Sequence, residues 1–158
     1  MNARLVRRVV TIALAQLVLL GLAVAPRLSA YAVGEEYRLR VAAYDPIDPF
    51  RGAYVQLDYP DLHTRIQERS TRPGDVYVRL VRDGSVWRGT GWSATRPDAA
   101  PYLACHSDGW QVRCGIESWF ADQDEARTVG ERLGRDGGVA TVRVDGRGHA
   151  VLVGLAVG

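Results

Sequence analysis

Residues 138–157 read GVATVRVDGRGHAVLVGLAV, and this stretch decides which class of fold to expect. Two runs in which apolar residues alternate flank a turn rich in glycine, a pattern typical of a β-hairpin. With a four-residue loop at 145–148, the predicted pairs are Val144 with His149, Val142 with Val151, and Ala140 with Val153. This register brings the apolar faces of both strands together, so we expect an antiparallel pair with one buried face.

The same period of two recurs upstream in short segments bounded by turn residues. The segments that carry it are 36–44, 53–59, 75–84, 85–92 and 102–120. In the first of them, Tyr37, Leu39 and Val41 share the apolar face. Strands at this spacing indicate a mainly β fold of about eight strands, arranged as a single sandwich or a partly closed barrel. Residues 60–74 are expected to form an exposed connection.

One segment has the periodicity of a helix. Asp122 can cap a helix that begins after it, and Ala126, Val129 and Leu133 follow at the spacing of one apolar stripe. Gly134 is predicted as the residue just past the end of the helix. Because the stripe is thin, we expect this short helix to lie on the surface of the sheet.

The first 30 residues predict a membrane anchor. Eighteen uncharged residues lie between Arg8 and Arg27, and at about 1.5 Å per residue they span roughly 27 Å, close to the ~30 Å core of a bilayer. Arginines precede this run, so the positive-inside rule leaves residues 31–158 outside the cytoplasm, as the domain of a single-pass protein of the cell membrane. The alternative is a signal peptide cleaved near residues 30–32, for which the apolar run is long. We favour the uncleaved anchor.

Charge excludes several classes of function. The chain contains 20 arginines and no lysine. Functions that need a lysine, such as a P-loop or a Schiff base, are therefore excluded. Four of the arginines lie in residues 1–30, which contain no acid, and residues 31–158 keep 16 arginines against 18 acidic residues, a net charge of −2. Without a basic surplus in the folded part, we expect no binding to nucleic acid.

The two cysteines fit an oxidising compartment. In a hairpin with a four-residue loop from Asp108 to Gln111, Cys105 lies directly opposite Cys114, within the range of a disulfide. The alternative is two buried free thiols. A zinc site with His106 is not expected, because His106 points to the other face of the strand and no fourth ligand is spaced to join it. No other pattern predicts a metal or a cofactor.

Three blocks of sequence resemble one family. Residues 45–59, DPIDPFRGAYVQLDY, are similar to the signature of the GDYXXLXY family of membrane-anchored bacterial proteins, and residues 114–120 (CGIESWF) and 144–157 (VDGRGHAVLVGLAV) resemble its later blocks. The matched positions of the signature are Asp45, Asp48, Phe50, Arg51, Gly52, Tyr54, Leu57 and Tyr59. Ala53 departs from it, since the family has an aspartate there. The resemblance implies an anchored envelope protein, often encoded beside polytopic membrane proteins, and it implies no particular reaction.

These blocks also supply the candidate polar cluster. It consists of Asp45, Asp48, Arg51, Tyr54 and Glu117. One hypothesis makes it a binding site in which Arg51 holds an acidic ligand, and the other makes it structural, with Arg51 paired to Asp48 or Glu117. We favour the structural interpretation and assign no catalytic residue, because no serine lies in a nucleophile elbow and the histidines match no triad.

The predicted function is therefore non-enzymatic. We expect a membrane-anchored extracytoplasmic domain that binds a partner, an integral-membrane protein above all. The alternative is an envelope hydrolase built on Asp48 and Glu117, with Asp45 and Arg51 in support. Two carboxylates that converge at about 5–9 Å in an open cleft would favour the hydrolase. Burial of Glu117 against Arg51 would favour the binding module.

Overall fold

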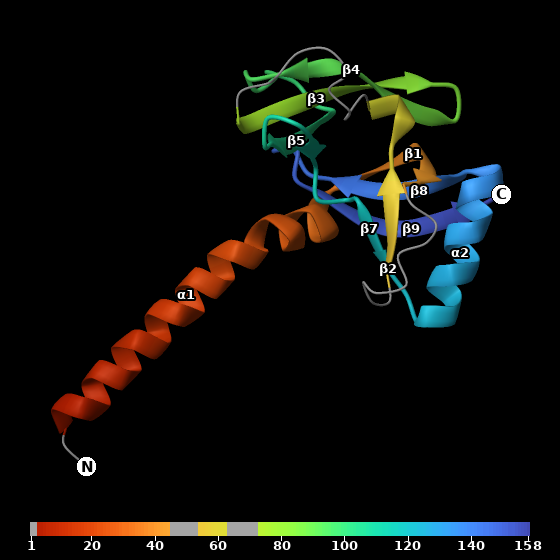
Figure 1. Cartoon of the computed structure of the whole chain (residues 1–158). Coiled ribbons are helices and arrows are strands. Elements are labelled where there is room, and N and C mark those ends of the chain that lie inside the picture. Colours follow the sequence, from red (N-terminus) through yellow and green to blue (C-terminus); the bar gives the residue numbers. More distant parts are fainter. Residues whose placement is uncertain (1–2, 45–53, 63–72) are drawn as a thin grey trace.

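A computed structural model describes residues 3–44, 54–62 and 73–158 (Figure 1). A long N-terminal helix leads into a curled, half-barrel β-sheet that carries a second, shorter helix. The elements in chain order are α1 (Ala3–Val33), β1 (Glu35–Ala43), β2 (Tyr54–Asp58), the 3₁₀ helix η1 (Pro60–Leu62), β3 (Gly74–Asp83), β4 (Val86–Ser93), β5 (Tyr102–Ser107), β6 (Val112–Arg113), β7 (Ser118–Phe120), α2 (Gln123–Asp136), β8 (Gly138–Val144) and β9 (Ala150–Val157). The predicted mainly β fold is confirmed, in its partly closed barrel form.

Strand β1 is the centre of the sheet. It pairs with β8 in antiparallel fashion over Glu35–Val41, lies parallel to β4 at Leu39, and pairs with β2 through Ala42 and Ala43. From β1 the sheet continues through β4, β3 and β5 to β6 on one side and through β2 to β7 on the other, while β9 extends it beyond β8. Because one strand serves three partners, the sheet curls around it and encloses a single core.

The core lies on the face that the alternating pattern predicts. Tyr37, Leu39 and Val41 are buried, while Arg38 and Arg40 between them are exposed. The inward residues of β2 and β3 join the same cluster and are Val55, Leu57, Val76, Val78 and Leu80. Burial of these side chains contributes on the order of 1.5–3 kcal/mol each, which is the main force that holds the curled sheet closed.

Helix α2 covers part of this core. The Asp122 carboxylate accepts hydrogen bonds from the N–H groups of Asp124 and Glu125, so the predicted N-cap is confirmed. Leu133 is buried, and α2 contacts β1, β2 and β9. The predicted end at Gly134 is wrong, because the helix continues to Asp136 and ends at Gly137, whose φ is +69°. A left-handed residue is needed there to turn the chain into β8.

The C-terminal hairpin exists, but its predicted register is wrong. Val144 pairs with Ala150 rather than His149, because the loop comprises five residues, 145–149. A β-bulge between Thr141 and Val142 then shifts the pairing again. Beyond the bulge Ala140 pairs with Leu155 instead of the predicted Val153. The apolar residues of β8 stay buried, although their partners on β9 differ from those predicted.

The connection after β2 begins inside the core. Leu62, in η1, is only 1% exposed, so the first residues of the predicted exposed connection are partly buried. A side chain on Gly89 in β4 would meet the backbone of Leu62 at 3.2 Å, which shows how closely η1 lies on the sheet. The rest of the connection, residues 63–72, lies outside the described residues.

Candidate functional site

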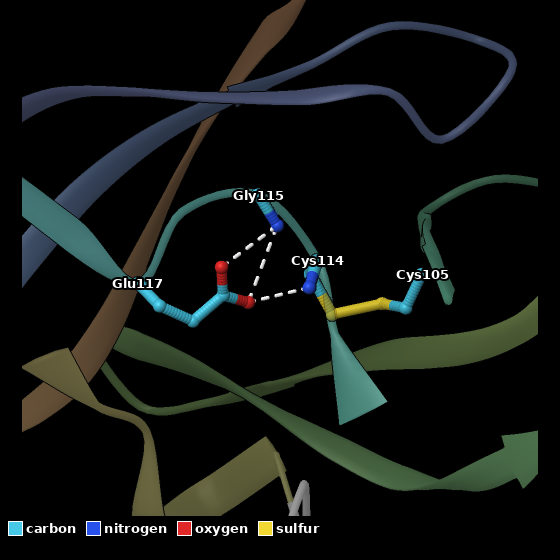
Figure 2. The surroundings of a disulfide bond; sticks show 4 residues. All are labelled: Cys105, Cys114, Gly115 and Glu117. Carbon is cyan, nitrogen blue, oxygen red and sulfur yellow. Dashed lines mark hydrogen bonds between the residues drawn. A yellow bond between two sulfur atoms is a disulfide. The ribbon is translucent and has the colours of Figure 1, made fainter. Parts of the chain in front are cut away.

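Glu117 lies in the short segment between β6 and β7 and closes its own turn (Figure 2). Its Oε1 accepts hydrogen bonds from the N–H groups of Cys114 and Gly115, and its Oε2 accepts a second bond from Gly115 at 2.9 Å. Backbone N–H groups therefore point at both oxygens of this carboxylate. Glu117 thus has a structural role, as favoured from the sequence, but its partners among the described residues are backbone N–H groups of its own turn.

Strand β2 is bonded to the same turn. The N–H of Leu57 donates to the carbonyl oxygen of Glu117 at 2.8 Å, and the Tyr59 hydroxyl donates to the carbonyl oxygen of Ile116 at 2.8 Å. Burial, and then the negative charge of Glu117, raise the pKa of Tyr59 well above its usual value of 10. Tyr59 thus remains a protonated hydrogen-bond donor at neutral pH and fixes the turn to the sheet.

A small cavity of about 50 Å³ lies beside this turn. Its lining includes Asp58, Tyr59, Arg113 and Glu117. Such a volume holds a few water molecules, whereas pockets for small substrates are typically about 300–1,000 Å³. Among the described residues, then, the surroundings of Glu117 form a hydrogen-bonded turn beside a cavity too small for a typical substrate.

The rest of the predicted polar cluster is only partly described. Asp45, Asp48 and Arg51 lie outside the described residues, so the pairing of Arg51 with Glu117 stays a prediction. Tyr54 is on β2 and faces Phe120 of β7, with ring centroids 5.9 Å apart. Tyr54 does not line the cavity beside Glu117, so the structure associates Glu117 with Tyr59 instead.

Cys105 and Cys114 form a disulfide, with their Cα atoms 4.1 Å apart. The hairpin that they close has the four-residue loop expected from the sequence, because the N–H of Asp108 donates to the carbonyl oxygen of Gln111. Both sulfurs are consumed, which leaves no thiolate there for a metal. Among the described residues, no group of three or more His, Cys, Asp or Glu side chains is placed to hold a metal ion.

Sequence reasoning missed Asp145, in the loop between β8 and β9. This carboxylate is only 5% exposed and has four donors: its Oδ1 accepts the N–H groups of Arg147 and His149, and its Oδ2 accepts the Ser29 hydroxyl at 2.7 Å and His149 Nδ1 at 3.0 Å. Burial alone would raise the pKa of Asp145, but these hydrogen bonds outweigh burial and lower it to about 2. An aspartate at the start of a Gly-rich turn was the available signal, and it indicated only a turn.

Asp145 belongs to a joint between α1 and the β-domain. Ala30 is fully buried, although most of α1 is exposed. The guanidinium of Arg143 on β8 donates two hydrogen bonds to the carbonyl oxygen of Gly34, at 3.1 and 2.9 Å, and lies 5.9 Å from the centre of the Tyr31 ring. The last turns of α1 are thus packed and bonded as part of the domain.

The remainder of α1 extends away from the domain (Figure 1). Residues Val6–Val33 are long and apolar enough to cross a membrane, and the most apolar window of 18 residues within them has a mean hydropathy of 2.3. Fold and joint together define a class of protein: a curled β-domain with a long apolar helix fixed to its N-terminal end.

Comparison with known families makes this assignment specific. The chain matches the GDYXXLXY protein family over residues 16–155, which is most of its length, and it belongs to that family. The matched region includes the part of α1 from Gln16 onward, both cysteines and the C-terminal hairpin. No curated protein and no solved structure matches the chain significantly.

Proposed function

We propose that this protein is a membrane-anchored accessory module whose β-domain is held outside the cytoplasm against an integral-membrane partner. The observation that carries the proposal is the joint between α1 and the domain. Ser29, Ala30 and Gly34 all make contacts with the β8–β9 region, so the anchor is attached without a flexible linker. A flexible linker would let the domain reorient relative to its anchor, whereas a packed joint keeps one face of the domain next to the bilayer.

Two features support the external location. Arg4, Arg7 and Arg8 precede the apolar run, which orients the amino terminus toward the cytoplasm. The Cys105–Cys114 disulfide suits the oxidising side of a membrane, since disulfides are rare in a reducing cytosol.

The type of partner follows from the two surfaces that the joint holds together. The side chains described between Val6 and Ala25 are exposed, so within a bilayer they face lipid or the helices of another protein. On the domain, Phe120 is 77% exposed and lies against Tyr54, at the end of the sheet path formed by β7. Exposed aromatic residues of this kind are frequent anchors of protein interfaces. A polytopic membrane protein can contact both surfaces at once.

The surroundings of Glu117 also favour an accessory role over the alternative of a hydrolase. Both oxygens of Glu117 are occupied by the backbone of its own turn, and the cavity beside it measures about 50 Å³. A hydrolytic carboxylate pair needs an open cleft that accepts a substrate and an attacking water. The described part of the chain offers Glu117 no such cleft.

Site-specific photo-crosslinking in intact cells tests the proposal. A photoreactive amino acid is placed at Leu17 in α1, at Phe120 on β7 and, as a control, at Arg132 on the outer face of α2. We expect Leu17 and Phe120 to crosslink to the same integral-membrane protein and Arg132 to give no such product. Crosslinks from Leu17 to lipid alone, with none from Phe120, would contradict the proposal. A reporter that is active only outside the cytoplasm, fused after Gly158, checks the orientation separately.

A further inference from the structure

A second, larger hollow is lined by Cys105, His106 and Arg113 of the disulfide hairpin. It has a volume of about 710 Å³ and is open to solvent. Its polar lining includes Arg96, Arg113 and Arg147 together with His106, His149 and Asp75. Asp75 lies 3.4 Å from His106 Nδ1, so the acid on the wall faces a histidine rather than an arginine. The hollow is therefore a site of concentrated positive charge, although residues 31–158 as a whole carry a net charge of −2.

In this arginine hollow, hydrogen bonds orient Arg96, and acidic partners are few in the described part of the chain. Arg96 donates from Nε to the Tyr102 hydroxyl at 2.5 Å and from Nη2 to the carbonyl oxygen of Gly146 at 3.3 Å. No carboxylate of the described residues lies within 4.0 Å of a nitrogen of Arg96 or Arg147, and Arg113 only reaches Asp108 at 4.0 Å. Among the described residues, two guanidinium groups without an acidic partner and a third whose pairing with Asp108 is at the 4.0 Å limit form a recognition surface for an anion.

The arginine hollow lies beside the C-terminal end of α1, where the helix joins the β-domain. Asp145 Oδ2 accepts both the Ser29 hydroxyl and His149 Nδ1, so the wall that carries His149 and Arg147 is bonded directly to the helix. Ser29 follows Arg27, which ends the apolar run, by two residues, and at about 1.5 Å per residue this is roughly 3 Å along the axis. One wall of the hollow is therefore within reach of the interface where the helix would leave the bilayer.

The hairpin on the opposite wall has the side chains of a membrane interface. Trp110, at the tip of the β5–β6 hairpin, is 88% exposed, and Arg113 follows on β6. The tip is rigid, because the Asp108 carboxylate accepts the N–H groups of Trp110 and Gln111 and the disulfide closes the strands behind it. Tryptophan is enriched at the headgroup level of membranes, and arginine clusters beside a span attract anionic lipid.

We propose that the arginine hollow binds the phosphate-bearing headgroup of an anionic lipid in the outer leaflet of the membrane that holds α1. The planar guanidinium forks of Arg96 and Arg147 match two oxygens of a phosphate, and Arg113 supplies the third positive charge. Because α1 tethers the hollow beside the headgroups, their effective concentration is high and individually weak contacts suffice. The inference rests on the proposed membrane anchoring, and it is independent of the protein partner.

Native mass spectrometry of the full-length chain tests this inference. The protein is released from detergent micelles that contain equal amounts of phosphatidylglycerol and phosphatidylcholine, and the retained lipids are counted. We expect at least fivefold more phosphatidylglycerol than phosphatidylcholine on the parent protein. The triple variant R96Q/R113Q/R147Q should retain the two lipids about equally. The triple variant R127Q/R132Q/R135Q, which removes the same charge from α2 on the side of the domain away from α1 (Figure 1), should keep the preference.

Two further arms make the result decisive. The melting temperatures of all three proteins in detergent must agree within about 2 °C, and if the hollow variant is less stable, the single variant Arg147→Gln replaces it, because Arg147 is exposed. Competition with 20 mM inorganic phosphate separates a lipid site from a site for a soluble anion. Equal retention of both lipids by the parent, an unchanged preference in the hollow variant, or loss of phosphatidylglycerol to phosphate would each overturn the inference. Intact crosslinks from Leu17 and Phe120 alongside such a result would leave the proposed function standing.

Discussion

Two acidic residues, Asp145 and Glu117, connect segments of this protein that lie apart in the sequence. The Asp145 carboxylate connects Ser29 in α1 to the backbone and the imidazole of His149, across 116 residues of chain. Glu117 connects segments over a shorter range. Its carboxylate accepts the N–H of Cys114 within the turn after β6, and its carbonyl oxygen accepts the N–H of Leu57 in β2. Both acids are polar groups whose removal would leave several partly buried donors without an acceptor.

Replacing Asp145 by Asn should destabilise the protein in a pH-dependent way. The folded pKa of about 2 lies below the unfolded value of 3.8, so the carboxylate stabilises the fold fully above about pH 4 and loses that contribution as the pH falls toward 2. At pH 7 the variant should lose on the order of 2 kcal/mol. Thermal unfolding of the full chain in detergent at several pH values between 7 and 2 measures both effects.

The control for this prediction is Asp98→Asn, because Asp98 is exposed in the loop before β5. It should shift the melting temperature little at any pH. Equal behaviour of the two variants would mean that the bonds from Ser29 and His149 add nothing to stability.

Replacing Glu117 by Gln should destabilise the turn after β6. The amide keeps one acceptor oxygen, but its NH₂ group then faces an N–H of Cys114 or Gly115, and a lost buried acceptor costs about 1–3 kcal/mol. Chemical denaturation measures the loss, with Glu131→Gln on the exposed face of α2 as the control. A double-mutant cycle of Arg51→Ala with Glu117→Ala tests the pairing expected from the sequence: additive effects would show that Arg51 does not depend on Glu117.

At the scale of elements, the sequence pattern predicted the buried faces of the strands and the start of α2. It did not predict the β8–β9 register or the end of α2, which depend on contacts between distant segments. The inward faces of β1, β2 and β3 follow the period of two, and Asp122 caps α2 as expected. The β8–β9 register failed because a bulge at Thr141 and a loop extended by the bonds to Asp145 leave no trace in the hydrophobic pattern. The helix end failed because Gly134 and Gly137 are equivalent by type, and only the path into β8 decides between them.

The candidate site shows the same division. Glu117 entered the candidate cluster through the block CGIESWF, yet its partners are backbone N–H groups, which the sequence of side chains does not reveal. Ser29 and Asp145 belong to segments that were interpreted separately, as an anchor and as a turn. Nothing in the spacing of the two residues predicts their contact, because it depends on how α1 enters the sheet.

The junction between α1 and β1 offers a sharp test of the joint. A Cβ on Gly34 would lie 2.3 Å from the carbonyl oxygen of Ala30 and 2.9 Å from the backbone nitrogen of Val144. Backbone atoms cannot yield without opening the joint, so Gly34→Ala should cost about 1–3 kcal/mol or more. The matched control is Gly21→Ala in the same helix, where no atom lies within 4 Å of the added methyl group.

Unfolding of both glycine variants in detergent provides the comparison. Gly21→Ala should be neutral or stabilising, because alanine favours helix over glycine by about 1 kcal/mol. If Gly34→Ala were as stable as the parent, α1 would not be packed against the domain in the way described.

At the scale of the whole molecule, the joint bears on processing of the chain. Cleavage near residues 30–32 would remove Ser29 and Ala30, break the bond to Asp145 and uncover the surface that Ala30 buries. We therefore expect the mature protein to retain its N-terminal segment. Intact-mass measurement on protein purified from membranes checks this, and a mass lacking residues 1–32 would show that the domain is released without its helix.

The packed joint also makes α1 a lever. With 31 residues at about 1.5 Å each, the helix is roughly 46 Å long, so a change of about 10° in its tilt displaces one end relative to the other by about 8 Å. Transmembrane helices tilt in response to a mismatch between their apolar length and the thickness of the bilayer. If α1 spans a membrane as proposed, the hydrogen bonds that Arg143 and Asp145 make to the end of α1 transmit such a tilt to the β-domain, and membrane thickness would then set the angle at which the surfaces of the domain meet a neighbour.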